Sequence, residues 1–110
     1  MAVSDDYLAY LQDLFEWLPR VRIKRMFGGA GLYSDELFFA IADDNAVYLK
    51  ADKQSEAFYR QRGAEQFSYE MKGKPSHMNF WLVPAEVLED PELLHEWVDT
   101  ALGSALRGKK

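Results

Sequence analysis

Three glycines within residues 28–31 restrict the fold of this chain more than any other feature of its sequence. The segment stands between two apolar runs, Met26-Phe27 before it and Leu32-Tyr33 after it. Glycine is used where φ is positive, where a strand bulges, or where another backbone or a ligand comes close. The segment therefore indicates a backbone of unusual shape within a β-rich part of the chain.

The spacing of Gly28, Gly29 and Gly31 does not fit the known phosphate-binding loops. A P-loop ends in Lys followed by Ser or Thr, and a dinucleotide fingerprint leads into a helix, whereas a strand pattern follows here. We therefore interpret the three glycines as a structural motif, either a bulge or a tight contact between strands. The alternative is a small ligand-binding or enzymatic domain that uses residues 28–31 together with Arg25.

Hydrophobic periodicity predicts three helices and five strands. Helical spacing extends from Tyr7 to Leu18, residues 53–62 form a second helix, and Asp90-Pro91 begins the last one. Strands are expected from residue 20 into the glycine segment and at residues 37–42, 47–50, 67–71 and 78–83. The order α-β-β-β-α-β-β-α predicts a two-layer α+β domain with a five-stranded antiparallel sheet. We expect one domain over residues 1–106 and a disordered basic tail at 107–110.

The run from residue 25 to residue 33, followed by Phe39-Ala40 and by residues 47–52, resembles the N-terminal domain of the TfoX/Sxy family of competence regulators. Further matching positions are Phe67, Tyr69, Met78, Trp81 and Pro84. The resemblance covers nearly the whole chain and implies the same α+β fold. It also implies a non-enzymatic regulatory module that serves competence for DNA transformation and transcription regulation through a protein partner, such as a transcription activator. Longer members carry a second, helical domain, and we expect this chain to be the N-terminal domain alone.

Charge is unevenly distributed along the chain, which has 13 basic and 18 acidic residues and a net charge of -5. An acidic body repels the phosphate backbone, so we expect weak or no direct binding of nucleic acid. Four cations nevertheless lie within six positions: Arg20, Arg22, Lys24 and Arg25. We interpret them as candidates for binding an anion or an acidic partner. The alternative is an edge strand that charge protects from aggregation.

The sequence contains no recognisable set of catalytic or metal-binding residues. It has no cysteine, His77 and His95 are far apart, and a strand would turn Ser76 and His77 to opposite faces. We therefore expect no enzymatic activity, no metal and no cofactor. The lack of cysteine fits a reducing cytoplasm, and neither a signal peptide nor a membrane span is present. We expect a cytoplasmic protein without membrane contact.

Two predicted strands, residues 37–42 and 78–83, are apolar on both faces. The helices of a two-layer domain cover only one face of the sheet, so aromatic side chains should remain on the other. A contiguous apolar surface usually marks an interface. We expect a homodimer that buries this face. The alternative is that the last helix and the linker at residues 84–89 cover it.

Overall fold

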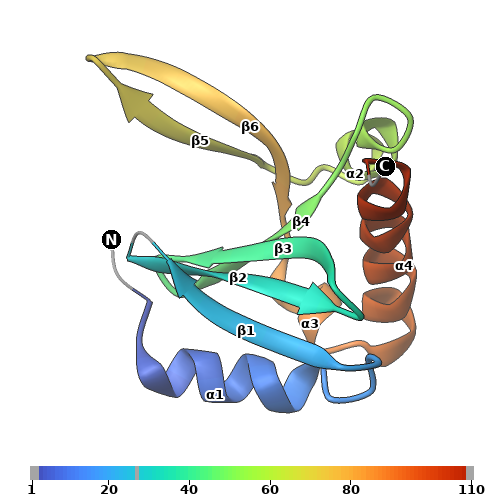
Figure 1. Cartoon of the computed structure of the whole chain (residues 1–110). Coiled ribbons are helices and arrows are strands. Elements are labelled where there is room, and N and C mark those ends of the chain that lie inside the picture. The colour runs from blue at the N-terminus through green and yellow to red at the C-terminus, as the bar shows by residue number, and fades with distance from the viewer. Residues whose placement is uncertain (1–2, 27, 109–110) are drawn as a thin grey trace.

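The computed structural model describes residues 3–26 and 28–108, with the side chains of Glu70, Met71 and Pro75 left out. Its elements are α1 (Asp5–Leu14), β1 (Val21–Met26), β2 (Gly29–Ser34), β3 (Leu37–Asp43), β4 (Ala46–Lys50), α2 (Glu56–Gln61), β5 (Gln66–Met71), β6 (Lys74–Leu82), α3 (Ala85–Leu88) and α4 (Pro91–Gly108). The strands form one sheet in the order β1-β2-β3-β4-β6-β5, and all neighbours are antiparallel (Figure 1). The predicted α+β class is confirmed.

The sheet has six strands, and the expected number of five was wrong because the glycine segment contains a turn. Gly28 has φ +82°, a conformation that glycine adopts without steric cost. The chain then reverses, so that Gly29 pairs with Met26 and Ala30 pairs with Arg25. Residues 20–34 therefore form a hairpin of β1 and β2, where the sequence had suggested one continuing strand. Phe27 lies outside the described residues.

Three other hairpins close through two-residue turns in which both residues have positive φ. The turns are Asp35-Glu36 between β2 and β3, Asp44-Asn45 between β3 and β4, and Lys72-Gly73 between β5 and β6. Turns of this type match the right-handed twist of the strands that they join. Because turn type and length fix the register of a hairpin, these dipeptides determine which residues face each other across the sheet.

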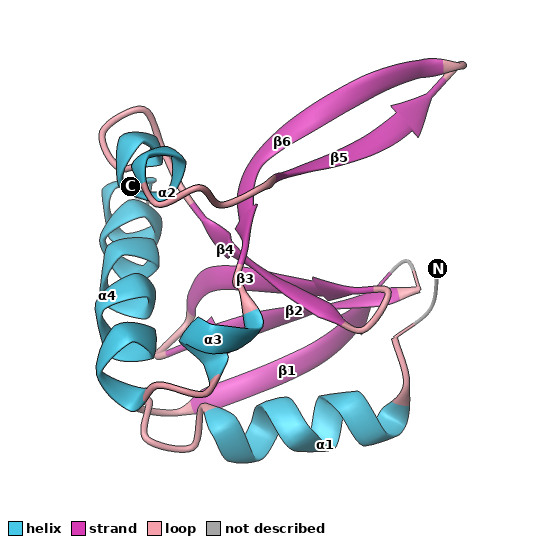
Figure 2. Cartoon of the chain, turned by 180° about the vertical axis from the view of Figure 1, so that it is seen from behind, coloured by secondary structure: helices cyan, strands magenta, loops and turns pink. Residues whose placement is uncertain are grey.

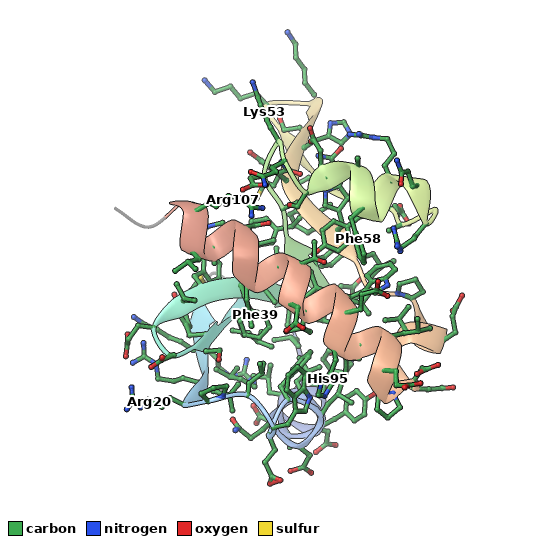
Figure 3. All side chains as sticks on the ribbon, turned by 90° about the vertical axis from the view of Figure 1, so that its right-hand side faces the viewer. Arg20, Phe39, Lys53, Phe58, His95 and Arg107 are labelled. Atoms are coloured by element: carbon green, nitrogen blue, oxygen red, sulfur yellow. The ribbon has the colours of Figure 1, made fainter. Side chains whose placement is uncertain are left out.

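The hydrophobic core lies between one sheet face and the helices. Figure 1 shows α1 running along β1 and α4 standing beside β3 and β4. Four buried side chains stand in register across this face: Leu32, Ala40, Leu49 and Trp81. A bulge opposite Leu32 and Tyr33 also turns Phe39 into the core, where its ring meets Phe15 edge-on at 5.8 Å between centroids. Figure 3 shows Phe39 beneath α4.

The helix boundaries follow the expected caps in part. Ser4 caps α1 by accepting a hydrogen bond from the backbone N–H of Tyr7, and Asp90 accepts from the first turn of α4. The second helix is shorter than predicted, and α3 forms where a linker was expected. Because α4 continues to Gly108, Arg107 and Gly108 of the expected tail are helical, and residues 109–110 lie outside the described part.

No helix within the described residues combines the length and the apolar character needed to cross a bilayer.

Candidate interaction face

The sheet face opposite the core, which we call the open face, carries aromatic and aliphatic side chains. Gly31, Ile41, Tyr48 and Leu82 are register neighbours that alternate with the core residues, so they mark this face. Its half-buried side chains include Met26, Tyr33, Phe38, Ile41, Tyr48 and Phe67. In the described part of the chain, α1 and α4 pack on the other face, and the C-terminal turn of α4 only borders the open face beside Phe38 and Lys50.

A row of cations and rings crosses the open face. The guanidinium of Arg22 lies 5.2 Å from the ring centroid of Tyr33, and the ammonium of Lys50 lies 5.7 Å from that of Phe38. The rings of Tyr33 and Phe38 are 5.1 Å apart, and those of Phe38 and Phe80 are 5.8 Å apart. The five side chains come from five different strands, so only the strand pairing brings them together. A cation over a ring contributes about 0.5–1 kcal/mol at exposed sites.

Two glycines of the motif accommodate close packing around β2. A Cβ atom at Gly31 would lie 2.8 Å from Met26 Cε and 3.1 Å from Phe38 Cε1, so these side chains occupy the space over Gly31. A Cβ atom at Gly29 would lie 2.5 Å from the backbone carbonyl oxygen of Ala42, closer than real Cβ atoms come. Both glycines therefore serve contacts within the sheet.

Arg22 and Lys24 lie on β1 and share the open face, as strand alternation predicts. Arg22 also pairs with Glu36 at 3.3 Å, with both side chains more than half exposed. Lys24 and Lys50 form no ion pair among the described residues. The basic strip and the aromatic surface, which the sequence presented as separate features, therefore meet on one face.

Arg20 and Arg25 do not join them. Arg20 precedes β1 with φ +48° and pairs with Asp35 at 2.7 Å. Arg25 lies on the helix side, where it forms an ion pair with Asp5 and donates a hydrogen bond to the carbonyl oxygen of Val3 at 3.3 Å. The contacts of Arg25 thus join β1 to the start of α1, and no observation links it to a bound ligand.

The far end of the open face is acidic. Burial raises the pKa of Tyr48, and the carboxylates of Asp43, Glu65 and Asp44 raise it further. The Tyr48 hydroxyl therefore keeps its proton at neutral pH and can donate a hydrogen bond. The open face thus has cations at the end of Arg22 and Lys50 and carboxylates at the end of Asp43.

The histidines lie away from this face and from each other. His77 is exposed on β6, while His95 on α4 stacks on Trp17 with 3.6 Å between ring centroids. Among the described residues, acidic and histidine side chains form no group of three that could hold a metal ion. The arrangement on the open face suits recognition by contact.

Sequence patterns could not identify every residue of the open face. The apolar run of β3 left Phe38 and Phe39 equivalent, and the bulge decided between them. Lys50 was missed because nothing near it in the sequence connects it to Arg22. Only the strand order and register could have revealed that Lys50 faces Phe80 and approaches Phe38.

The fold and the open face together define a small α+β domain built for contact with another molecule. The model of the TfoX N-terminal domain family matches residues 13–105, and the chain belongs to this family. The chain is also similar to the DNA transformation protein TfoX1 of Aliivibrio fischeri, with 23% identity over 106 residues that represent 93% of this chain and 51% of the relative. It thus spans about half the length of that relative. Members of the family are generally regulatory rather than catalytic.

Proposed function

We propose that this chain is a cytoplasmic, non-enzymatic regulatory module for DNA transformation and transcription that binds a protein partner through the open face. The observation that carries this proposal is the row formed by Arg22, Tyr33, Phe38, Lys50 and Phe80 across five strands. The family match and the similarity to a DNA transformation protein support the regulatory role.

The composition of the open face favours a protein as the partner. Aromatic residues, Met and Arg are enriched in the centres of protein interfaces, and aromatic and Arg side chains contribute most of the binding energy there. The cations Lys24 and Lys50 add a preference for carboxylates, since neither forms an ion pair within the described chain. The partner surface should therefore combine apolar and acidic side chains. A transcription activator is the kind of partner that the family implies.

Photo-crosslinking in the native cell tests this proposal. A photoreactive phenylalanine analogue at Tyr33 places the reactive group on the open face, and the same analogue at Tyr10 places it on α1, where the tyrosine is 43% exposed. Both changes replace one aromatic ring with another. We expect Tyr33 to yield an adduct with a transcription regulator and Tyr10 to yield none.

Charge reversal provides the second arm. Lys24→Glu combined with Lys50→Glu should abolish the Tyr33 adduct and lower expression of the genes that the partner controls. Arg62→Glu, on the helix side, should leave both unchanged. Equal adducts from Tyr33 and Tyr10, or an adduct that survives the double charge reversal, would contradict the assignment of the open face.

A further inference from the structure

The two edges of the sheet differ in charge and in their surroundings. The strand order makes β1 one edge and β5 the other. The β1 edge has four cations within residues 20–25, and α1 packs against it. Charge and a covering helix are the usual ways in which proteins prevent pairing at an edge strand. The β1 edge is therefore protected.

The β5 edge lacks this protection. Residues 66–71 contain one formal charge, at Glu70, and no proline or lysine. Figures 1 and 2 show the outer part of the β5–β6 hairpin projecting from the body and standing clear of the helices. An exposed strand of this kind is a ready template for another strand.

The projecting part of the hairpin is also only two strands wide. The pairing of β6 with β4 covers Phe80 to Leu82, while its pairing with β5 continues out to Lys74. A two-stranded hairpin alone is marginally stable in water, and three or more strands are needed for independent stability. A third strand along β5 would therefore stabilise the projection.

The backbone of β5 has groups available for such a strand. Met71 and Lys74 flank the two-residue turn, and Pro75, which has no N–H, faces Glu70. In an antiparallel ladder, hydrogen-bonded and non-hydrogen-bonded pairs alternate. The closing pair Met71–Lys74 is hydrogen-bonded, so Tyr69 also bonds to β6. Ser68 and Glu70 therefore direct their backbone N–H and C=O groups away from β6.

We propose that the β5 edge binds β5 of a second copy of this chain, antiparallel and about a two-fold axis. This contact is self-complementary, since each copy offers the same donors and acceptors, and it closes both unprotected edges at once. The proposal goes beyond the proposed function because it uses the edge and leaves the open face free for a different protein. It also relocates the expected dimer contact from the open face to the edge.

Charge favours this edge over the remaining surface for a second copy. Two bodies with a net charge of -5 each repel at short range. Antiparallel pairing of the projections places the bodies at opposite ends of a ribbon about 20 Å long, given about 3.3 Å per residue for six residues. That separation exceeds the Debye length of about 8 Å at physiological salt, so the repulsion is largely screened.

Light scattering after size exclusion on the full chain tests the proposal with two variants at one position. Ser68→Pro removes an N–H that points away from β6, so it should leave the fold intact and give the mass of one chain. Ser68→Ala keeps that N–H and should give the mass of two chains, as should the unmodified protein. Far-UV circular dichroism and the melting temperature show whether Ser68→Pro remains folded.

Hydrogen exchange on the unmodified protein provides a test that needs no variant. The amides of Ser68 and Glu70 should be protected at high protein concentration and should exchange faster on dilution. A single-chain mass at every concentration, or exchange at these two amides that is fast and independent of concentration, would overturn the proposal. So would a dimer that survives Ser68→Pro but is lost in Met78→Lys, because that result places the contact on the open face.

Discussion

The guanidinium of Arg107 in α4 binds both oxygens of the Asp52 carboxylate, with Nε 2.7 Å from Oδ2 and Nη2 3.0 Å from Oδ1. Asp52 also accepts hydrogen bonds from the backbone N–H groups of Gln54 and Ser55 just before α2. Ser55 in turn is 2.6 Å from Ser104 of α4 through a buried pair of hydroxyls. Asp52 therefore ties the end of the last helix to the loop that follows β4, and Figure 3 shows Arg107 at that end of α4.

Replacing Arg107 should reduce stability in a pH-dependent way. The hydrogen bond from Arg107, followed by those from Ser55, holds the pKa of Asp52 well below its ordinary value of 3.8. A depressed pKa in the folded state stabilises the protein above the ordinary pKa, and this contribution is lost as the pH falls through the folded value. The melting temperature of Arg107→Gln should thus lie below that of the unmodified protein at neutral pH, and the difference should shrink below about pH 4.

Arg62→Gln is the matched control for this measurement. Its guanidinium stands 3.9 Å from Glu96 with both side chains exposed, and such pairs contribute little. Thermal melts of the three proteins across the acid range decide the matter. A difference for Arg107→Gln that stays constant down to strongly acidic pH would contradict the role of the Asp52 carboxylate.

Alanine at Gly29 should destabilise the protein more than alanine at Gly31. The new Cβ atom at Gly29 meets the backbone oxygen of Ala42, which the sheet holds in place, whereas at Gly31 it meets the ends of side chains that can move. Overpacking costs about 1–3 kcal/mol, and each 1 kcal/mol lowers the melting temperature of a domain of this size by roughly 4–8 °C. Calorimetry on both variants measures the difference. Equal melting temperatures for the two variants would refute this ranking.

Tyr59→Phe should cost about 0.5–1.5 kcal/mol, the usual net value of one hydrogen bond. The ring of Tyr59 is fully buried, and its hydroxyl donates to the carbonyl oxygen of Trp97 at 3.2 Å. Tyr10→Phe removes a hydroxyl from an exposed ring on α1 and should change the free energy of unfolding by less than about 0.5 kcal/mol. Urea denaturation of both variants provides the comparison. A Tyr59→Phe variant as stable as Tyr10→Phe would show that this hydroxyl contributes nothing.

Duplex DNA should bind weakly and without sequence preference. The body carries a net charge of -5, and Arg20, Arg22 and Arg25 already pair with carboxylates of the same chain. Residual contacts to phosphate should weaken further as salt rises. Fluorescence anisotropy with labelled duplexes of different sequence measures this at physiological ionic strength. Sub-micromolar affinity for one sequence would reverse the conclusion that the partner is a protein.

Local signals in the sequence predicted much of the fold. Ser4 and Asp90 cap helices as expected, and the turn dipeptides fell where the apolar runs end. The turn at Gly28 was missed because three glycines fit a bulge and a turn equally well. The length of β6 was also underestimated, since Lys74 and Pro75 suggest a loop when considered alone, and they became strand only through pairing with β5.

The candidate site was predictable only in part, for a reason that concerns distance along the chain. Alternation within one strand correctly placed Arg22 and Lys24 on the same face. It could not show that Lys50 and Phe80 join them, because that depends on β6 entering the sheet beside β4. It also could not show that Arg25 would find its partner in Asp5, which belongs to a helix on the other side.

The two-residue turns at Asp35-Glu36 and Asp44-Asn45 have a consequence for the order in which the molecule assembles. Closing such short loops costs little chain entropy, so β2, β3 and β4 can find one another early. The contact between Tyr48 and Leu82 joins positions 34 residues apart and must wait for the chain between them. We expect the N-terminal half to form the folding nucleus, and the projecting hairpin to be the last part gained and the first lost.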